Sequence, residues 1–106
     1  MNFGCILLAC GCDPSLRGFD YLETLAILRE QDHFAPMCSL YEAAGQMVGS
    51  TAGAVERAAR YCINRTIDCR GSEDMARVLH QAPDLDSGSY SIGRFLALLV
   101  RAAKAI

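Results

Sequence analysis

Three charged side chains, Glu56, Arg57 and Arg60, stand within one turn and a half of a stretch that has the composition of a helix. Their chemistry suits the reading of DNA bases. A guanidinium such as that of Arg57 donates two parallel hydrogen bonds to O6 and N7 of guanine, and a carboxylate accepts from N4 of cytosine. Arg60 suits either a second base or a phosphate. The simpler alternative is that Glu56 and Arg60, four residues apart, form a solvated ion pair on a helix surface.

Ser50 and Thr51 directly precede this stretch. Either hydroxyl can cap the first helical turn by accepting a hydrogen bond from an otherwise unpaired amide. Hydroxyls and backbone amides at a helix start also suit a DNA phosphate, so both residues are candidates for contact with the DNA backbone. Gly49 permits a sharp turn before them. The pattern of residues 45–64 therefore predicts a helix-turn-helix, with residues 52–64 as its recognition helix. Beyond residue 64 we expect the same helix to continue to about residue 69.

Winding this second helix at about 100° per residue separates two faces. The face expected to pack against the rest of the protein carries Val55, Ala58, Ala59, Cys62 and Thr66. The face expected to point outward carries Gly53, Glu56, Arg57, Arg60, Tyr61 and Asn64. Alanine and glycine in both helices allow the close, steep approach that a DNA-reading helix pair requires.

Apolar periodicity predicts further helices on either side of this pair. The first helix of the pair is expected to start at Cys38 or Ser39, with Glu42 at capping-box spacing from Ser39. It is expected to pack through Leu40, Ala43, Ala44 and Met47. A glycine stop at Gly71 and a cap at Ser72 follow the second helix, and residues 82–91 read as a loop. The other expected helices cover residues 1–9, about 18–31, 75–79 and 91–105.

The segments described above predict an all-α fold, a compact bundle of about six helices that contains the helix-turn-helix, and the resemblance described below implies the same number of helices. The 106 residues have the length of one domain, so we expect a single helical domain over residues 1–106. Hydrophobic residues make up 52%, with alanine and leucine prominent, which favours helices. No apolar run approaches the roughly 20 residues that a membrane span needs, and no export signal is evident. We therefore expect a cytoplasmic protein with no membrane partner.

Six cysteines lie at positions 5, 10, 12, 38, 62 and 69. Without an export signal, disulfides are not expected, and Cys5, Cys38 and Cys62 read as small core residues. Cys10 and Cys12 lack a second Cys or His pair at the spacing of a zinc site, so neither a metal nor another cofactor is expected. No Ser/His/Asp or Cys/His set emerges either. We therefore expect no catalytic residues and no enzymatic activity.

Several segments resemble one known family. The run from Ser50 to Arg60 is similar to Thr-Thr-Ala-Ser-Arg-Val-Glu-Arg-Ala-Ile-Arg, the recognition-helix segment in the C-terminal DNA-binding domain of the sporulation master response regulator of endospore-forming bacteria. Residues 18–22, Gly-Phe-Asp-Tyr-Leu, resemble that family's Gly-Tyr-x-Tyr-Leu entry into its first long helix. Leu-Tyr at positions 40–41 and Phe-Leu-Ala at 95–97 also have counterparts. The resemblance spans almost the whole chain.

This resemblance implies an all-helical DNA-binding domain that controls sporulation initiation. It implies that the helix 52–64 enters the major groove of double-stranded DNA with a TGTCGAA-like box, and that two copies bind tandem sites head to tail. The family residues that match Glu56 and Arg57 contact bases. Arg17 stands where the family has lysine, and Arg17 and Arg65 complete the candidates for DNA backbone contact.

Departures from the family pattern keep a second interpretation open. Ala54 replaces a family arginine, the basic lead into the last helix is replaced by residues 89–93, and the formal net charge is −2. DNA affinity depends on phosphate neutralisation, although residues 45–70 are locally basic. The alternative is a divergent protein-interaction module without strong DNA binding. With no room for a receiver domain, we expect either an excised effector domain or a stand-alone homologue.

Overall fold

The computed structural model describes residues 2–105. Within that range the chain forms six α-helices joined by turns and loops, and no strand occurs there. The predicted all-α fold of about six helices is confirmed. In chain order the helices are α1 (Phe3–Ala9), α2 (Arg17–Gln31), α3 (Met37–Val48), α4 (Ala52–Arg70), α5 (Glu73–Leu79) and α6 (Ile92–Ala105).

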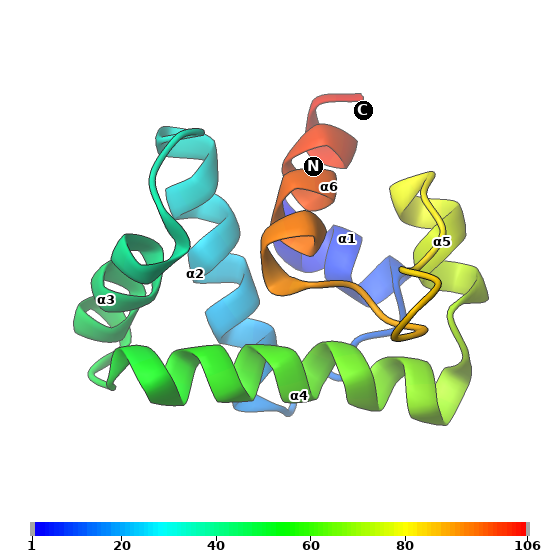
Figure 1. Ribbon diagram of the computed structural model, residues 1–106, viewed down its shortest axis with the longest axis horizontal. Coiled ribbons are helices and arrows are strands. Elements are labelled where there is room, and N and C mark those ends of the chain that lie inside the picture. Colours follow the sequence, from blue (N-terminus) through cyan, green and yellow to red (C-terminus); the bar gives the residue numbers. More distant parts are fainter. Residues whose placement is uncertain (1, 106) are drawn as a thin grey trace.

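The longest helix, α4, runs along one side of the molecule, and most of the rest of the chain lies on one side of it (Figure 1). Its inner face packs against α2, α3 and α6. Val55, Ala59, Cys62 and Thr66 are buried on that face, and Ala58 is half-buried. The sequence therefore predicted correctly which side of this helix packs, because its apolar residues recur at the helical period.

One glycine sets how closely α2 approaches α4. A Cβ atom placed on Gly18 would lie 2.1 Å from the carbonyl oxygen of Ala58 and 2.7 Å from the Cβ atom of Cys62. Both distances are far below van der Waals contact, and the first involves backbone that cannot move aside. Only glycine therefore fits at the first turn of α2, and this contact fixes the position of α2 against the middle of α4.

The turn between α3 and α4 forms as the sequence predicts. Gly49 takes the left-handed conformation, with φ of 69°, and ends α3. The Ser50 amide donates to the carbonyl oxygen of Gly45 at 2.8 Å, which closes the turn. The Thr51 hydroxyl accepts from the Ala54 amide at 3.1 Å and caps α4, so the predicted hydroxyl cap is Thr51. The two helices meet at a steep angle in Figure 1.

The start of α3 differs from the prediction. The helix begins at Met37, and Pro36 occupies the cap position with φ of −65° and ψ of 150°, so the expected capping box of Ser39 and Glu42 does not form. Proline presets the backbone angle that a helix needs and lacks the amide that would otherwise be unpaired there, which favours it at a helix start. At the other end of α4, Gly71 ends the helix with φ of 78°, but the Ser72 side chain makes no capping hydrogen bond.

Three residues expected in the core are exposed. Cys5 lies on the side of α1 opposite the buried Phe3 and Leu7, so the helix turns its thiol outward. Cys38 is likewise exposed in the first turn of α3. Met47 is 62% exposed, because the stripe of α3 that packs runs through Met37, Leu40, Ala44 and Val48 and leaves Met47 at its edge. Cys62 is fully buried, as predicted.

Candidate nucleic-acid interface

Arg57 is the one candidate base-contacting residue whose side chain forms no ion pair with another side chain of residues 2–105. It is exposed on the outer face of α4 and forms no ion pair or hydrogen bond with the side chains of residues 2–105. Its guanidinium lies over Gly53, one turn earlier, where a Cβ atom would be 3.2 Å from Nη1 of Arg57. Gly53 thus leaves room for the guanidinium along the helix surface, and the donors of Arg57 face solvent.

Glu56 and Arg60 pair with each other. Nη2 of Arg60 donates to Oε1 of Glu56 at 3.0 Å, and the two side chains are 37% and 56% exposed respectively. This is the surface ion pair that the spacing allowed as the simpler alternative. Such a pair stabilises a helix by only a few tenths of a kcal/mol. It therefore holds both groups near Arg57 at little cost to any contact with a ligand.

The four candidate backbone-contacting residues lie in three different places: before α4, on α4 and at the start of α2. Ser50 and Thr51 lie at its N-terminal end, where Ser50 is half-buried and the Thr51 hydroxyl already caps the helix. Arg17 is exposed and adjoins Gly18, so it flanks the middle of α4. Nη1 of Arg65 donates to the Tyr61 hydroxyl at 3.3 Å, which raises the pKa of Arg65. Six of the seven candidate residues therefore lie on α4 or directly before it, and Arg17 lies on α2.

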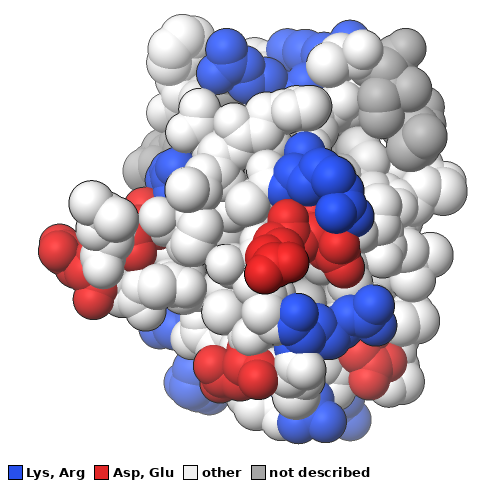
Figure 2. Space-filling view, turned by 90° about the vertical axis from the view of Figure 1, so that its right-hand side faces the viewer, with Lys and Arg blue, Asp and Glu red and all other residues white. Residues whose placement is uncertain are grey.

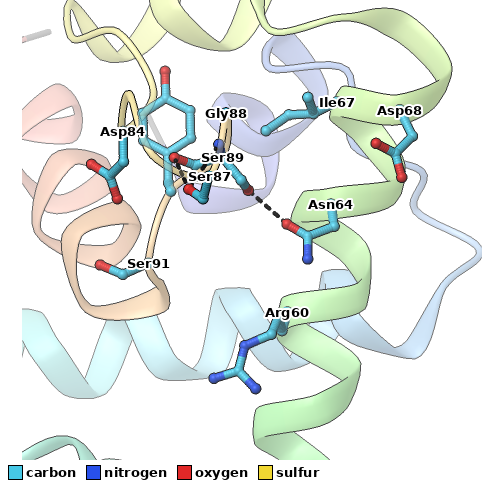
Figure 3. Close-up of a pocket in the computed structure, with 10 residues that line it drawn as sticks. Arg60, Asn64, Ile67, Asp68, Asp84, Ser87, Gly88, Ser89 and Ser91 are labelled. Atoms are coloured by element: carbon cyan, nitrogen blue, oxygen red, sulfur yellow. Dashed lines mark hydrogen bonds between the residues drawn. The ribbon is translucent and has the colours of Figure 1, made fainter.

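The sequence did not reveal a hollow that borders this face. Its volume is about 480 Å³, and it lies between α4 and the loop before α6, with Arg60 at one end (Figure 3). The Ser89 hydroxyl donates to Oδ1 of Asn64 at 2.6 Å and ties the loop to α4. A contact across 25 residues has no periodic sequence signal, so only the assembled fold shows it.

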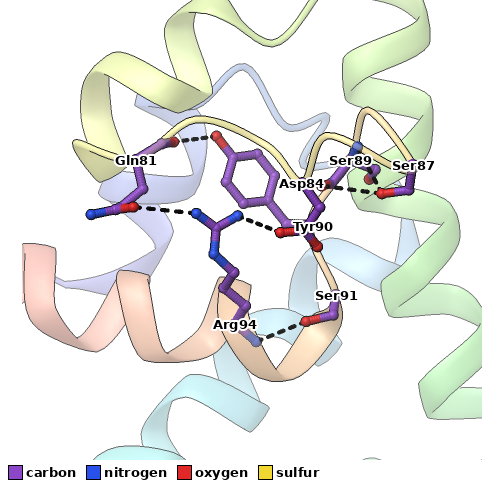
Figure 4. A network of polar contacts seen from close by, with 7 residues as sticks. All are labelled: Gln81, Asp84, Ser87, Ser89, Tyr90, Ser91 and Arg94. Atoms are coloured by element: carbon purple, nitrogen blue, oxygen red, sulfur yellow. Dashed lines mark hydrogen bonds and ion pairs between the residues drawn. The ribbon is translucent and has the colours of Figure 1, made fainter.

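A polar network holds this loop in place (Figure 4). Nη1 of Arg94 donates to Oδ1 of Asp84 at 2.8 Å, and its guanidinium lies 5.2 Å from the centre of the Tyr90 ring. The Tyr90 hydroxyl donates to the Gln81 carbonyl oxygen at 2.6 Å, and burial raises the pKa of Tyr90. The loop is therefore fixed on both sides, and it makes a firm wall beside the outer face of α4.

The charges around α5 and the C-terminal end of α4 alternate in sign. Figure 2 shows basic and acidic side chains interspersed over this side of the molecule, without a large area of one sign. On α4 itself, Glu56 and Asp68 oppose Arg57, Arg60, Arg65 and Arg70. Positive charge is therefore concentrated in individual arginines and does not form a broad basic surface.

Two further searches covered residues 2–105. Within that range, no group of three or more His, Cys, Asp or Glu side chains is placed to hold a metal ion. No helix in the described part of the chain has both the length and the apolar character needed to cross a membrane. His33, at the end of α2, is exposed.

No protein-family model matches the chain, and no curated protein matches it significantly.

Proposed function

We propose that this chain is a sequence-specific DNA-binding domain of the helix-turn-helix class, with α4 as its recognition helix. The observation that carries the proposal is the position of Arg57. This side chain is exposed, free of ion pairs within residues 2–105, and projects from the second helix of a tightly turned pair. A free guanidinium in that position matches the group that reads guanine most often in the major groove.

In the proposed complex, the exposed N-terminal half of α4 enters the major groove. Arg57 donates to a guanine, and Arg60 contacts a second base or a phosphate once its pair with Glu56 opens. Glu56 accepts from a cytosine. The helix start at Ser50 and Thr51, together with Arg17 and Arg65, meets the phosphates on either side, and these contacts set the position of the helix in the groove.

The resemblance to the sporulation regulator supplies the rest of the proposal. The domain would act in the cytoplasm, on tandem TGTCGAA-like boxes occupied by two copies head to tail, in the control of sporulation initiation. Pairing is a physical requirement as well, because one copy brings few positive charges. If two to four arginines neutralise phosphates, log K falls with log salt with a slope of roughly −2 to −4 for a single copy.

A titration followed by fluorescence anisotropy tests this proposal. The protein is added to a labelled duplex that bears two TGTCGAA-like boxes and, separately, to a scrambled duplex of the same composition, each at about 50 and 200 mM salt. We expect tighter binding to the boxes at both salt concentrations and weaker binding to both duplexes at the higher one. Absence of binding to either duplex at the lower concentration would contradict the proposal.

The second candidate function is a protein-interaction module. It is favoured by the net charge of −2 and by two exposed apolar side chains, Met47 on α3 and Tyr61 on α4, which are 62% and 55% exposed. Aromatic residues and methionine are enriched where proteins bind one another. The same titration separates the two candidates, because an interaction module binds neither duplex at low salt.

A further inference from the structure

Basic side chains converge on a hollow of about 490 Å³ between the C-terminal end of α2 and α6. Arg29 and His33 line it from the end of α2 and the turn that follows. Arg101 and Lys104 line it from α6. No carboxylate side chain of residues 2–105 lines it. In Figure 1 the C-terminal ends of both helices point away from α4, so this basic hollow is separate from the proposed DNA-binding face.

The positive charge at the basic hollow is not neutralised within the described part of the chain. Three of the ten Lys and Arg residues lie there, in a protein whose formal net charge is −2. The three ion pairs found within residues 2–105 all involve other arginines, so Arg29, Arg101 and Lys104 have no carboxylate of that range within ion-pair distance. Like charges around one hollow repel one another, and an anion bound between them would offset that repulsion.

The segment that follows α2 holds the Arg29 guanidinium in one position. Nη1 of Arg29 donates to the carbonyl oxygens of Ala35 at 2.8 Å and His33 at 3.1 Å, and Nη2 donates to Sδ of Met37 at 3.1 Å. These acceptors are uncharged, so they orient the half-buried guanidinium without neutralising it. The charge of Arg29 is therefore fixed at the hollow before a ligand arrives, which lowers the entropic cost of binding.

One side of α6 forms the opposite wall of the basic hollow. Four of its residues follow one another at intervals of four, four and three positions and so share that side: Gly93, Ala97, Arg101 and Lys104. Gly93 and Ala97 have little or no side chain, which keeps the space open, and Met37 borders it, since its Cγ and Sδ would lie 3.7 Å from a Cβ atom at Gly93. The wall is therefore apolar near the start of α6 and basic toward its end.

We propose that the basic hollow binds a small phosphomonoester, with the phosphate at its basic end and the organic group against its apolar end. The planar fork of an arginine donates two parallel hydrogen bonds to phosphate oxygens, and a lysine adds a point charge. A phosphomonoester carries nearly two negative charges at neutral pH, which match several cations better than the single charge of a carboxylate does. The volume of about 490 Å³ lies within the range of small-molecule sites.

Amide chemical shifts of the full chain, measured by NMR without any DNA, test this inference. Phenyl phosphate, inorganic phosphate and benzoate are added in separate titrations at constant ionic strength. We expect phenyl phosphate to shift the amides of residues 29–33 and 93–104 and to bind more tightly than either of the other two anions. Arg101→Gln and Lys104→Gln should each weaken the binding of phenyl phosphate roughly tenfold, as the loss of one charge-assisted hydrogen bond predicts.

Arg77→Gln is the matched control, because Arg77 is exposed on α5 and lies outside the basic hollow. It removes the same charge and should change the affinity for phenyl phosphate by less than about twofold, since salt screens distant surface charges.

Four results would overturn the inference. Absence of shifts at about 10 mM phenyl phosphate would exclude the site. Shifts confined to residues 50–54 would mean that the phosphate binds at the start of α4. Equal affinities for benzoate and phenyl phosphate would contradict the choice of phosphate, and equal affinities for the two phosphates would contradict the role of the apolar end.

Discussion

The two faces of α4 differ in how closely they are packed. The inner face is packed so closely that the first turn of α2 admits only glycine at position 18, against the Ala58 carbonyl and the Cys62 side chain. The outer face carries Arg57, whose guanidinium lies over Gly53 of the same helix and forms no ion pair or side-chain hydrogen bond within residues 2–105. The inner face of α4 therefore tolerates almost no added volume near Gly18, whereas on the outer face the Arg57 guanidinium is available to a ligand.

This difference indicates how a small domain can hold one exposed helix rigidly. Close packing behind α4 fixes its position without using Arg57, so this side chain is free to contact a ligand. Changes on the inner face should therefore alter the free energy of unfolding. Changes on the outer face should alter binding and leave stability nearly unchanged.

The largest expected effect follows substitution of Gly18 by alanine. The added methyl group would overlap the Ala58 carbonyl oxygen, so α2 and α4 would have to separate. We expect Gly18→Ala to lower the free energy of unfolding by about 3 kcal/mol, the upper range for overpacking. Urea unfolding followed by circular dichroism measures this loss.

Gly93→Ala is the matched control, because Gly93 is also helical and its nearest neighbours are side-chain atoms of Met37 at 3.7 Å. Alanine is the better helix former, so this variant should be neutral or up to about 1 kcal/mol more stable. Equal stabilities for the two variants would show that the contact between α2 and α4 is not as close as described.

A smaller effect on stability is expected at the N-terminus of α4, where Thr51 caps the helix. Thr51→Ala removes the hydroxyl that accepts from the Ala54 amide, and loss of such a cap costs about 1 kcal/mol. Ser50→Ala serves as the control, since the structure shows no capping hydrogen bond from Ser50. Its effect on urea unfolding should stay within about 0.5 kcal/mol. A larger loss for Ser50→Ala than for Thr51→Ala would reverse the assignment of the cap.

The smallest effect on stability is expected on the outer face. Glu56→Gln removes the charge that pairs with Arg60 across 3.0 Å at an exposed position. We expect a change of only a few tenths of a kcal/mol in unfolding free energy, and a smaller one in high salt. Thermal melts at low and high salt measure it. A loss above about 1 kcal/mol would mean that the pair holds the fold together.

Local sequence signals predicted much of this architecture. Gly49, Thr51 and Gly71 mark helix ends through their own backbone and side-chain preferences, and the structure confirms all three. The period of apolar residues gave the inner face of α4, including Val55 and Cys62. Such features depend on residues within one or two helical turns, so a single sequence contains them.

Features that depend on tertiary contacts escaped prediction. The burial of Cys12 and the exposure of Cys5 are set by which side of each short segment meets the core, and the same residue type fits both environments. The tie between Asn64 and Ser89 joins segments that are distant in sequence. The special need for glycine at position 18 arises only once α2 lies against α4. The candidate base-contacting residues, in contrast, were chosen from their chemistry and spacing together with the family resemblance, and their function stays a prediction.

The central claim, that the outer face of α4 reads DNA through Arg57, is tested most directly by one binding measurement. The affinities of wild type, Arg57→Ala and Arg77→Ala for the TGTCGAA-like duplex and its scrambled counterpart are compared by fluorescence anisotropy. Arg77 is exposed on α5 and pairs with Asp74, so it controls for the loss of one positive charge. We predict that Arg57→Ala weakens binding to the box by about 1 to 3 kcal/mol and abolishes the preference over the scrambled duplex, while Arg77→Ala keeps that preference. An Arg57→Ala protein that still prefers the box as strongly as wild type would contradict the claim.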